Sequence, residues 1–269
     1  RIERAVREGR DFRVNVIMPL LPAFPGTPAE DCTLRQVLNW QYKTICRGPQ
    51  SIMQALRAVT NEPHRYIGFY GLRQYGVLPS GLVQEQIYVH GKLMIVDDRT
   101  IICGSANIND RSMLPHTDSE VAVLVGDCED MIDSHMFGQP WKASKMAHSL
   151  RSRLTRRHLG LGSADAHLAD DPCGEETMRL WAETVTENTK AYREIFRCIP
   201  DDNVPTLNHI SAWEDGARTK VRPMHETLDQ MKARVRGHIV ELPMRFLEKE
   251  DLSVKWTEKE ALVSKRLFQ

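Results

Sequence analysis

The sequence predicts an α/β fold, in which a mixed β-sheet is flanked by helices and followed by a mostly helical C-terminal extension. A strand pattern at Phe12–Met18 is followed by two helix patterns and then by a second strand pattern at Arg65–Tyr70. Three further apolar runs lie close together between residues 86 and 125. Strands that alternate with helices and then cluster are typical of a sheet covered by helices. The chain has 269 residues, which is enough to bury a sizeable core.

The first two helices are predicted by their N-terminal signals. Thr33–Gln36 and Ser51–Gln54 both fit the capping box, in which a hydroxyl and a Gln three residues later satisfy free backbone N–H groups. We expect helices from these points to about Cys46 and Val59. The stretch from Gly71 to Ser80 contains two glycines and is predicted to be a loop.

Two more helices are expected after the clustered strands. Glu129–Met136 is predicted as a short helix and Trp141–His158 as a longer one with an apolar stripe. The opposite face of the longer helix is basic and carries no acid; its residues are Lys142, Lys145, Arg151, Arg153, Arg156 and Arg157. A basic amphipathic helix can lie on an anionic membrane, but a solvated face over a packed stripe is the simpler interpretation, which we favour.

The chain is expected to divide into three parts. Residues 1–160 would form the domain that holds the clustered strands. Residues 161–174 are rich in Gly, Asp and Ala and are predicted to be a linker or loop. Residues 175–269 would form an extension packed on the core, with a long helix at Glu175–Ile199 and a strand at Gly237–Pro243.

Composition excludes some classes of protein. Lys+Arg and Asp+Glu both number 36, so the net charge gives no reason to expect either a nucleic-acid or a membrane partner. The six cysteines have no C-x-x-C spacing and are expected to be reduced thiols of an intracellular protein. No apolar run approaches the ~20 residues that a membrane span needs.

The strongest feature is a set of polar residues on and between the clustered strands. It has the form H-x-K-x4-D followed by G-S-x-N, with His90, Lys92, Asp97, Ser105 and Asn107 at its named positions. On a regular strand, His90 and Lys92 point to one face and Asp97 to the other, so Asp97 is expected to be a support. A tight turn after Val96 would make a hairpin that returns Ser105 and Asn107 to the His/Lys end.

These residue types suit a phosphate. Lys92 and Asn107 can donate hydrogen bonds to anionic oxygens, and His90 can attack phosphorus or donate a proton. Glu120 directly precedes the third apolar run, Val121–Val125, and can reach the same end. Its carboxylate would accept the proton of the other imidazole nitrogen of His90 and fix the tautomer. A histidine on an apolar strand is usually structural, but the joint pattern favours a catalytic site.

The pattern resembles the HKD signature of the phospholipase D superfamily, and in particular the second HKD motif of the eukaryotic phosphatidylcholine-hydrolysing enzymes. The matching stretches are Ile87–Asp98, Gly104–Met113, Phe69–Arg73, Arg156–Gly160 and Gly237–Pro243. The resemblance implies a phospholipase D half-domain, and the chain is expected to be the C-terminal catalytic half of a longer enzyme. One stretch departs from the family, since Leu114–Glu120 lacks the usual Gly and Arg before Asp-Ser-Glu.

The resemblance also implies an activity. Family members hydrolyse phosphatidylcholine to phosphatidic acid and choline through a phosphohistidine, without cofactor or metal ion. The first-motif histidine is the nucleophile, so His90 would be the general acid and Glu120 would orient it. Lys92, Ser105 and Asn107 would bind the substrate phosphate.

Implied partners are the N-terminal HKD half of the same enzyme and the phospholipid membrane, with phosphoinositides and small GTPases as further candidates. The expected location is cytoplasmic, on the cytosolic face of membranes. Two alternatives stay open. One is another phosphodiesterase or phosphatidyltransferase of the superfamily, of the nuclease or cardiolipin-synthase type. The other is an inert module that binds a membrane or a partner.

Overall fold

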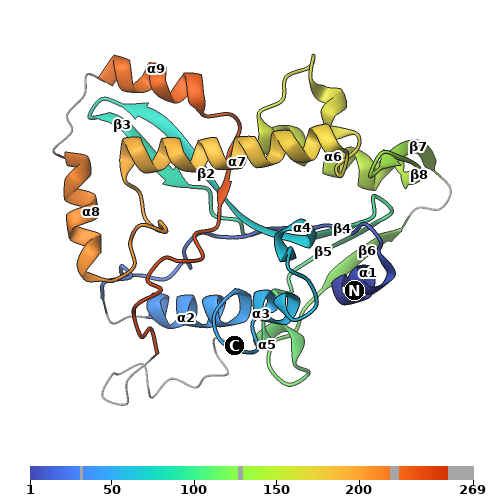
Figure 1. The fold of residues 1–269 in the computed structure, drawn as a ribbon, viewed down its shortest axis with the longest axis horizontal. Helices are drawn as coiled ribbons and strands as arrows, with labels where there is room; N and C mark the ends of the chain where they lie inside the picture. Colours follow the sequence, from blue (N-terminus) through green and yellow to red (C-terminus); the bar gives the residue numbers. More distant parts are fainter. Residues whose placement is uncertain (31–32, 127–129, 219–223, 254–269) are drawn as a thin grey trace.

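The computed structural model describes residues 1–30, 33–126, 130–218 and 224–253, and it confirms the α/β class (Figure 1). In chain order the elements are α1 (Ile2–Glu8), β1 (Val14–Ile17), α2 (Thr33–Ile45), α3 (Ile52–Arg57), α4 (Pro63–Tyr66), β2 (Ile67–Leu78), β3 (Gly81–Gln86), β4 (Lys92–Val96), β5 (Thr100–Gly104), α5 (Asp110–Met113), β6 (Ala122–Gly126), β7 (Met131–Met136), β8 (Gln139–Ser144), α6 (Lys145–Leu159), the 3₁₀ helix η1 (Ala166–Ala169), α7 (Glu175–Phe196), α8 (Asn208–Arg218), α9 (Met224–Arg234) and β9 (Ile239–Glu241).

The central sheet is built around β2. Its first residues pair with β1 in parallel, and Tyr70–Leu72 pairs with β9 in antiparallel fashion. The second half of β2 leaves this sheet and forms an antiparallel ribbon with β3. The sheet is therefore mixed, as the sequence predicts, and the last described strand completes it.

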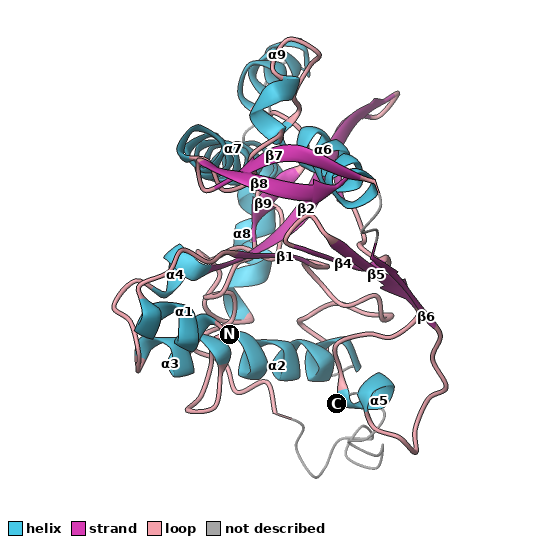
Figure 2. Ribbon diagram, turned by 90° about the vertical axis from the view of Figure 1, so that its right-hand side faces the viewer, coloured by secondary structure: helices cyan, strands magenta, loops and turns pink. Residues whose placement is uncertain are grey.

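Helices cover the central sheet on both sides. Figure 2 shows α2 and α3 below β1 and β2, and α6 and α7 above them. The α2 and α3 side buries Ile45 and Met53, and α7 contributes Val185 and Tyr192. Asn188 of α7 is fully buried, and its amide is satisfied there: it donates to the Arg236 and Ile239 carbonyls and accepts from the Arg236 N–H just before β9. The helices at Thr33 and Ser51 are confirmed, and the Ser51 side chain caps α3 by accepting from the Gln54 N–H.

A second sheet, with strand order β4-β5-β6, lies beside this packed body (Figure 1). Each of its strands is antiparallel to the next. Its apolar side chains are poorly covered, and Leu124 is 70% exposed and Val123 59% exposed. A third, two-stranded sheet pairs β7 with β8 and leads into α6.

Three predicted elements are wrong, each through a tertiary effect. The helix at Glu129–Met136 is instead strand β7 from Met131 onward, because that segment pairs with β8. Trp141 belongs to β8, and the basic helix begins only at Lys145. The loop at Gly71–Ser80 is strand β2 as far as Leu78. Gly71 is needed there because a Cβ would lie 2.2 Å from Leu20 Cδ2.

Residues 161–174 pack on the rest of the chain. Leu161 and Ala169 are buried, and η1 contacts both α6 and α7. The C-terminal part also enters the central sheet through β9. Within the described residues, no helix is both long and apolar enough to cross a bilayer.

Candidate phosphate-binding site

The hairpin predicted from the sequence is confirmed, and it gathers much of the site. Lys92 pairs with Gly104 across β4 and β5, so Ser105 follows directly at the Lys92 end. The Ser105 N–H donates to the Val121 carbonyl at 3.0 Å, which brings β6 and the preceding Glu120 to the same end. Three segments that are distant in sequence therefore supply one cluster.

Glu120 is engaged by hydroxyl groups. The Ser105 hydroxyl donates to the Glu120 carboxylate and accepts from the Val121 N–H at 3.1 Å. Hydrogen bonds from the side chains of Ser105 and Ser112 lower the pKa of Glu120, and the positive charge of Lys92 adds to this. Glu120 thus stays ionised at one edge of the cluster.

Lys92 and His90 lie close together, with His90 exposed and Lys92 partly exposed. The Lys92 Nζ donates to the His90 carbonyl at 2.6 Å, and the imidazole lies exposed beside the Tyr88 ring, with centroids 6.2 Å apart. His90 lies in the extended loop between β3 and β4, not on a strand. Strand alternation therefore does not determine its direction.

Other predicted contacts are not formed in the structure. In the part of the chain that the structure describes, no hydrogen bond joins Glu120 to His90, so the orienting role of Glu120 stays a prediction. Asn107 is exposed, and its backbone N–H donates to the Ser112 hydroxyl at 3.1 Å. Ser112 thus supports both Asn107 and Glu120, although the sequence analysis did not single it out.

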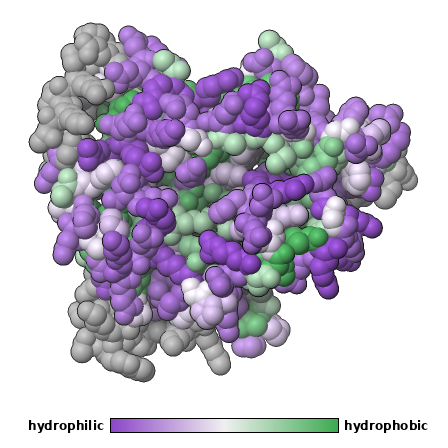
Figure 3. All heavy atoms as spheres, viewed as in Figure 1, coloured by the Kyte–Doolittle hydropathy of each residue, from purple (hydrophilic) through white to green (hydrophobic). Residues whose placement is uncertain are grey.

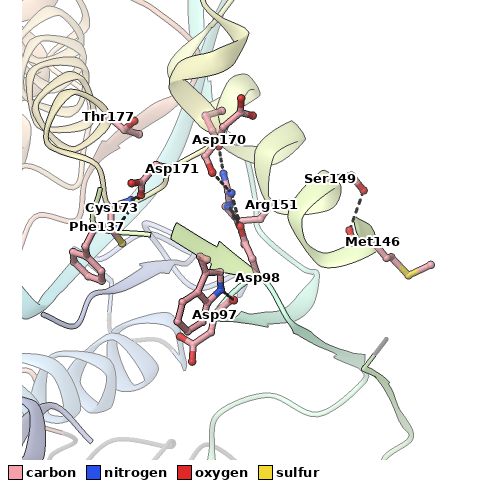
Figure 4. A network of polar contacts seen from close by, with 12 residues as sticks. Asp97, Asp98, Phe137, Met146, Ser149, Arg151, Asp170, Asp171, Cys173 and Thr177 are labelled. Atoms are coloured by element: carbon pink, nitrogen blue, oxygen red, sulfur yellow. Dashed lines mark hydrogen bonds and ion pairs between the residues drawn. The ribbon is translucent and has the colours of Figure 1, made fainter. Parts of the chain in front are cut away.

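The turn after β4 separates the roles of two neighbouring carboxylates. Asp97 and Asp98 both have positive φ, 55° and 53°, a conformation that Asp adopts more readily than most residues. The Asp97 side chain is exposed, while its backbone carbonyl accepts from Trp141 Nε1 at 2.8 Å. Asp98 is only 3% exposed and pairs with Arg151 of α6 at 2.5 Å (Figure 4). Asp98 therefore anchors the turn to α6, and the supporting role expected of Asp97 stays a prediction.

Arg151 extends this support to the segment after α6. It donates to the Ala169 carbonyl and, at 2.9 Å, to that of Asp170 (Figure 4). The Asp171 carboxylate then accepts from the Gly138 N–H of the β7–β8 turn at 2.7 Å. The sequence alone did not indicate this network, because Arg151 was one of the basic residues of a helix face expected to be solvated.

The cluster can bind an anion but lacks a second reacting group. Lys92, Ser105 and His90 offer an ammonium, a hydroxyl and one imidazole, which are donors suited to a phosphate. His90 is the histidine of the one H-x-K-x4-D motif in the sequence. Those residues also contain no group of three His, Cys, Asp or Glu side chains that could hold a metal ion.

Comparisons with known proteins agree with the HKD pattern. Residues 80–210 match the family model for phospholipase D. The chain is 39% identical over 295 residues to phospholipase D zeta 1 of Arabidopsis thaliana, covering 100% of this chain and 27% of that protein. It is 38% identical over 272 residues to phospholipase D1 of Homo sapiens, covering 98% and 25%. It is 46% identical over 217 residues to phospholipase D of Phytophthora infestans, covering 80% and 12%.

The matched stretch contains every residue of the cluster from His90 to Glu120. The chain spans about a quarter of the length of the Arabidopsis and human relatives. The similarity nevertheless extends along nearly all of this chain. The chain belongs to the phospholipase D superfamily.

Proposed function

We propose that the chain supplies the second-motif half of an active site that hydrolyses phosphatidylcholine to phosphatidic acid and choline. The observation that carries this proposal is the cluster of Lys92, Ser105 and Glu120 beside a single exposed imidazole, His90. In-line displacement through a covalent intermediate needs two groups on opposite sides of phosphorus. A histidine bonded to phosphorus cannot also protonate the leaving oxygen, so the second imidazole comes from another half.

In the proposed reaction, the first-motif histidine attacks phosphorus and the bond from phosphorus to the choline oxygen breaks. His90 gives its proton to that oxygen and choline leaves. His90 then takes a proton from water, whose oxygen attacks phosphorus and breaks the phosphorus–nitrogen bond. Phosphatidic acid leaves and the first histidine is restored. Lys92, Ser105 and Asn107 hold the phosphate oxygens throughout.

The second sheet supports a partner of this kind. Its exposed apolar residues include Met94, Ile102 and Leu124, which face one another across the three strands on one side of the sheet. Contiguous apolar surface of this type marks interaction sites. The proposed occupant is the N-terminal HKD half of the same enzyme. The proposed location of the assembled enzyme is the cytosolic face of a membrane, where its substrate lies. Phosphoinositides and small GTPases remain proposed regulators by family resemblance.

The test is reconstitution. The purified chain is mixed with a separately expressed N-terminal half that carries the first HKD motif, and choline release from phosphatidylcholine vesicles is measured. Activity is expected in the mixture and not in either half alone. Robust choline release by the chain alone would contradict the half-site and favour a homodimer. Release of nucleotides but no choline would favour the nuclease alternative.

A further inference from the structure

A large cavity lies away from the HKD cluster, at the start of β2. Its volume is about 680 Å³, and its lining comes from the residues just after α2 and from α3, α4, β2 and α7, among others. None of the predicted site residues lines it. The middle of the face in Figure 3 is hollowed, with apolar residues inside and hydrophilic residues around them. The volume is in the range of cavities that hold small organic ligands.

One wall of the cavity carries an arginine that is fixed without a carboxylate. Arg47 donates to the Met244 carbonyl at 3.2 Å and to that of Phe246, and it stacks on the Tyr42 ring at 3.8 Å. Its Nε is buried and has no hydrogen-bond partner. The guanidinium is thus held in place by neutral groups, and its charge is not neutralised by an ion pair in the described residues.

A second arginine, Arg13, also lines the cavity and is held by groups on and before β2. Arg13 donates to the Tyr70 hydroxyl at 2.6 Å and to the Arg65 carbonyl at 3.1 Å. A Cβ at Gly68 would lie 2.1 Å from that hydroxyl and 2.8 Å from Arg13 Nη2. Glycine at this position therefore makes room for the Arg13–Tyr70 pair over the strand.

A third arginine is free to bind. Arg57 lines the cavity from α3, is exposed, and makes no hydrogen bond or ion pair with any described residue. Its charge and that of Arg13 help to lower the pKa of His64, after burial, which is the largest cause. Positive charge therefore converges on this side of the cavity from three separate segments.

The rest of the cavity differs in character. Its floor is apolar, with Phe69, Val185 and Leu242 among the lining residues. Its lining also carries acids, among them the partly buried Asp202 and the more exposed Glu241, and loss of hydration raises the pKa of both. A ligand that fits must place an anion at the arginines and an apolar part on the floor, away from the acids.

We propose that this cavity binds a phosphomonoester that carries an apolar tail, with the phosphate at Arg57 and Arg47 and the tail over Phe69 and Val185. Arginine donors in a fixed fork suit the oxygens of a phosphate. A dianionic phosphomonoester gains more from three converging charges than a zwitterionic phosphodiester does. Both a phospholipid with a phosphomonoester head group and a free alkyl phosphate have this chemistry.

The test measures binding to the whole 269-residue chain by calorimetry. The probes are dihexanoyl phosphatidic acid below its micelle-forming concentration, dihexanoyl phosphatidylcholine and inorganic phosphate. We expect one molecule of the phosphatidic acid to bind per chain, and inorganic phosphate to bind about tenfold or more weakly because it buries no tail. The phosphatidylcholine should bind weakly or not at all. Equal affinity for inorganic phosphate would overturn the tailed ligand, and absence of phosphatidic acid binding would overturn the site.

Variants locate the site. Arg57→Gln should weaken phosphatidic acid binding about tenfold, because one charge-assisted contact is lost. Arg153→Gln is the matched control, since Arg153 is exposed on α6, outside the cavity, and should leave the affinity unchanged. Ala182→Phe should weaken the binding of phosphatidic acid, because the larger side chain on α7 narrows the cavity. Equal affinities of the two arginine variants would contradict the proposal.

Lys92→Ala separates the cavity from the HKD cluster. Binding should be unchanged in this variant, whereas reconstituted choline release should be lost. If Lys92→Ala abolished phosphatidic acid binding, the ligand would lie at the HKD cluster and the cavity would not be its site. That result would leave the proposed hydrolase intact, so the two proposals fail separately.

Discussion

The two larger sheets of the molecule differ in how they are supported. Residues Ile67–Arg73 of β2 are all buried, because helices cover both faces of the central sheet. On the sheet of β4, β5 and β6, apolar residues of both faces are exposed, such as Val123 on one and Leu124 on the other. The covered sheet holds the fold together. The uncovered sheet carries the phosphate-binding residues and is available for a partner.

The uncovered sheet is tied down at its two ends. At the turn end, Asp98 is anchored to Arg151 of α6. At the site end, Ser105 links β5 to Glu120 and β6. Substitutions in the middle of the second sheet should therefore affect partner binding. Substitutions at the site end should affect activity, and substitutions at the Asp98–Arg151 ion pair should affect stability.

The largest expected effect is on activity, from Lys92→Ala. Because the ammonium is aimed at the phosphate, reconstituted choline release should fall about 10³-fold. The melting temperature should change by less than ~2 °C, since the Lys92 amine binds only an exposed carbonyl in the described structure. Lys142→Ala, at an exposed ion pair on β8, is the control and should retain activity. A large drop in melting temperature would show that the site end is also structural.

The next effect is on stability, from Asp98→Asn. Removing the carboxylate leaves Arg151 partly buried without its ion-pair partner, which should cost about 3 kcal/mol. For a chain of this size the melting temperature should fall by roughly 6–12 °C. Thermal unfolding followed by circular dichroism measures this.

Asp97→Asn is the matched control for the anchor. Asn tolerates the left-handed conformation of that position at least as well as Asp does, and the side chain is exposed. The free energy of unfolding should change by less than about 0.5 kcal/mol. Equal destabilisation by both variants would show that the turn itself, and not the ion pair, anchors the sheet.

A third prediction concerns how the stability of the helix-covered region, which includes His158, depends on pH. His158 lies at the end of α6, where burial, followed by the charges of His238 and Arg157, lowers its pKa to about 4. The unfolded chain has a pKa near 6.5 at this residue and binds more protons between the two values. Stability should therefore be complete above pH 6.5 and fall by about 2–3 kcal/mol as the pH drops to 4.

His158→Gln should remove this part of the pH dependence, as measured by denaturant unfolding between pH 4 and pH 7. His116→Gln, in an exposed loop beside the second sheet, should leave it unchanged. If the His116 variant altered the dependence of the unfolding free energy on pH and the His158 variant did not, the assignment of this dependence to the packed region would be wrong.

The smallest effect on stability is expected from Leu124→Thr. Leu124 is 70% exposed, so the free energy of unfolding should change by less than about 0.5 kcal/mol. Titration with the N-terminal half should nevertheless show weaker association, because an apolar contact is removed. Unchanged association would mean that this face of the sheet is not the contact surface.

The sequence predicted best what short-range chemistry determines. Ser51 caps its helix as expected, and the turn at Asp97 and Asp98 places Ser105 beside Lys92. It failed where distant segments decide. Met131–Met136 becomes a strand only through β8, and Gly71 marks close packing by Leu20, not a loop. Asp98 could not be distinguished from Asp97, since its partner Arg151 lies 53 positions away.

The position of β9 has a consequence for how the molecule folds. It pairs with β2 across roughly 170 positions of sequence, so the central sheet contains contacts between residues that are very far apart in the chain. Such pairings close late and slow folding. At about 5–20 residues per second, synthesis takes roughly 10–35 s to pass from one strand to the other. Throughout that interval one edge of β2 is unpaired, and the emerging chain presents an open strand edge of the kind that invites aggregation.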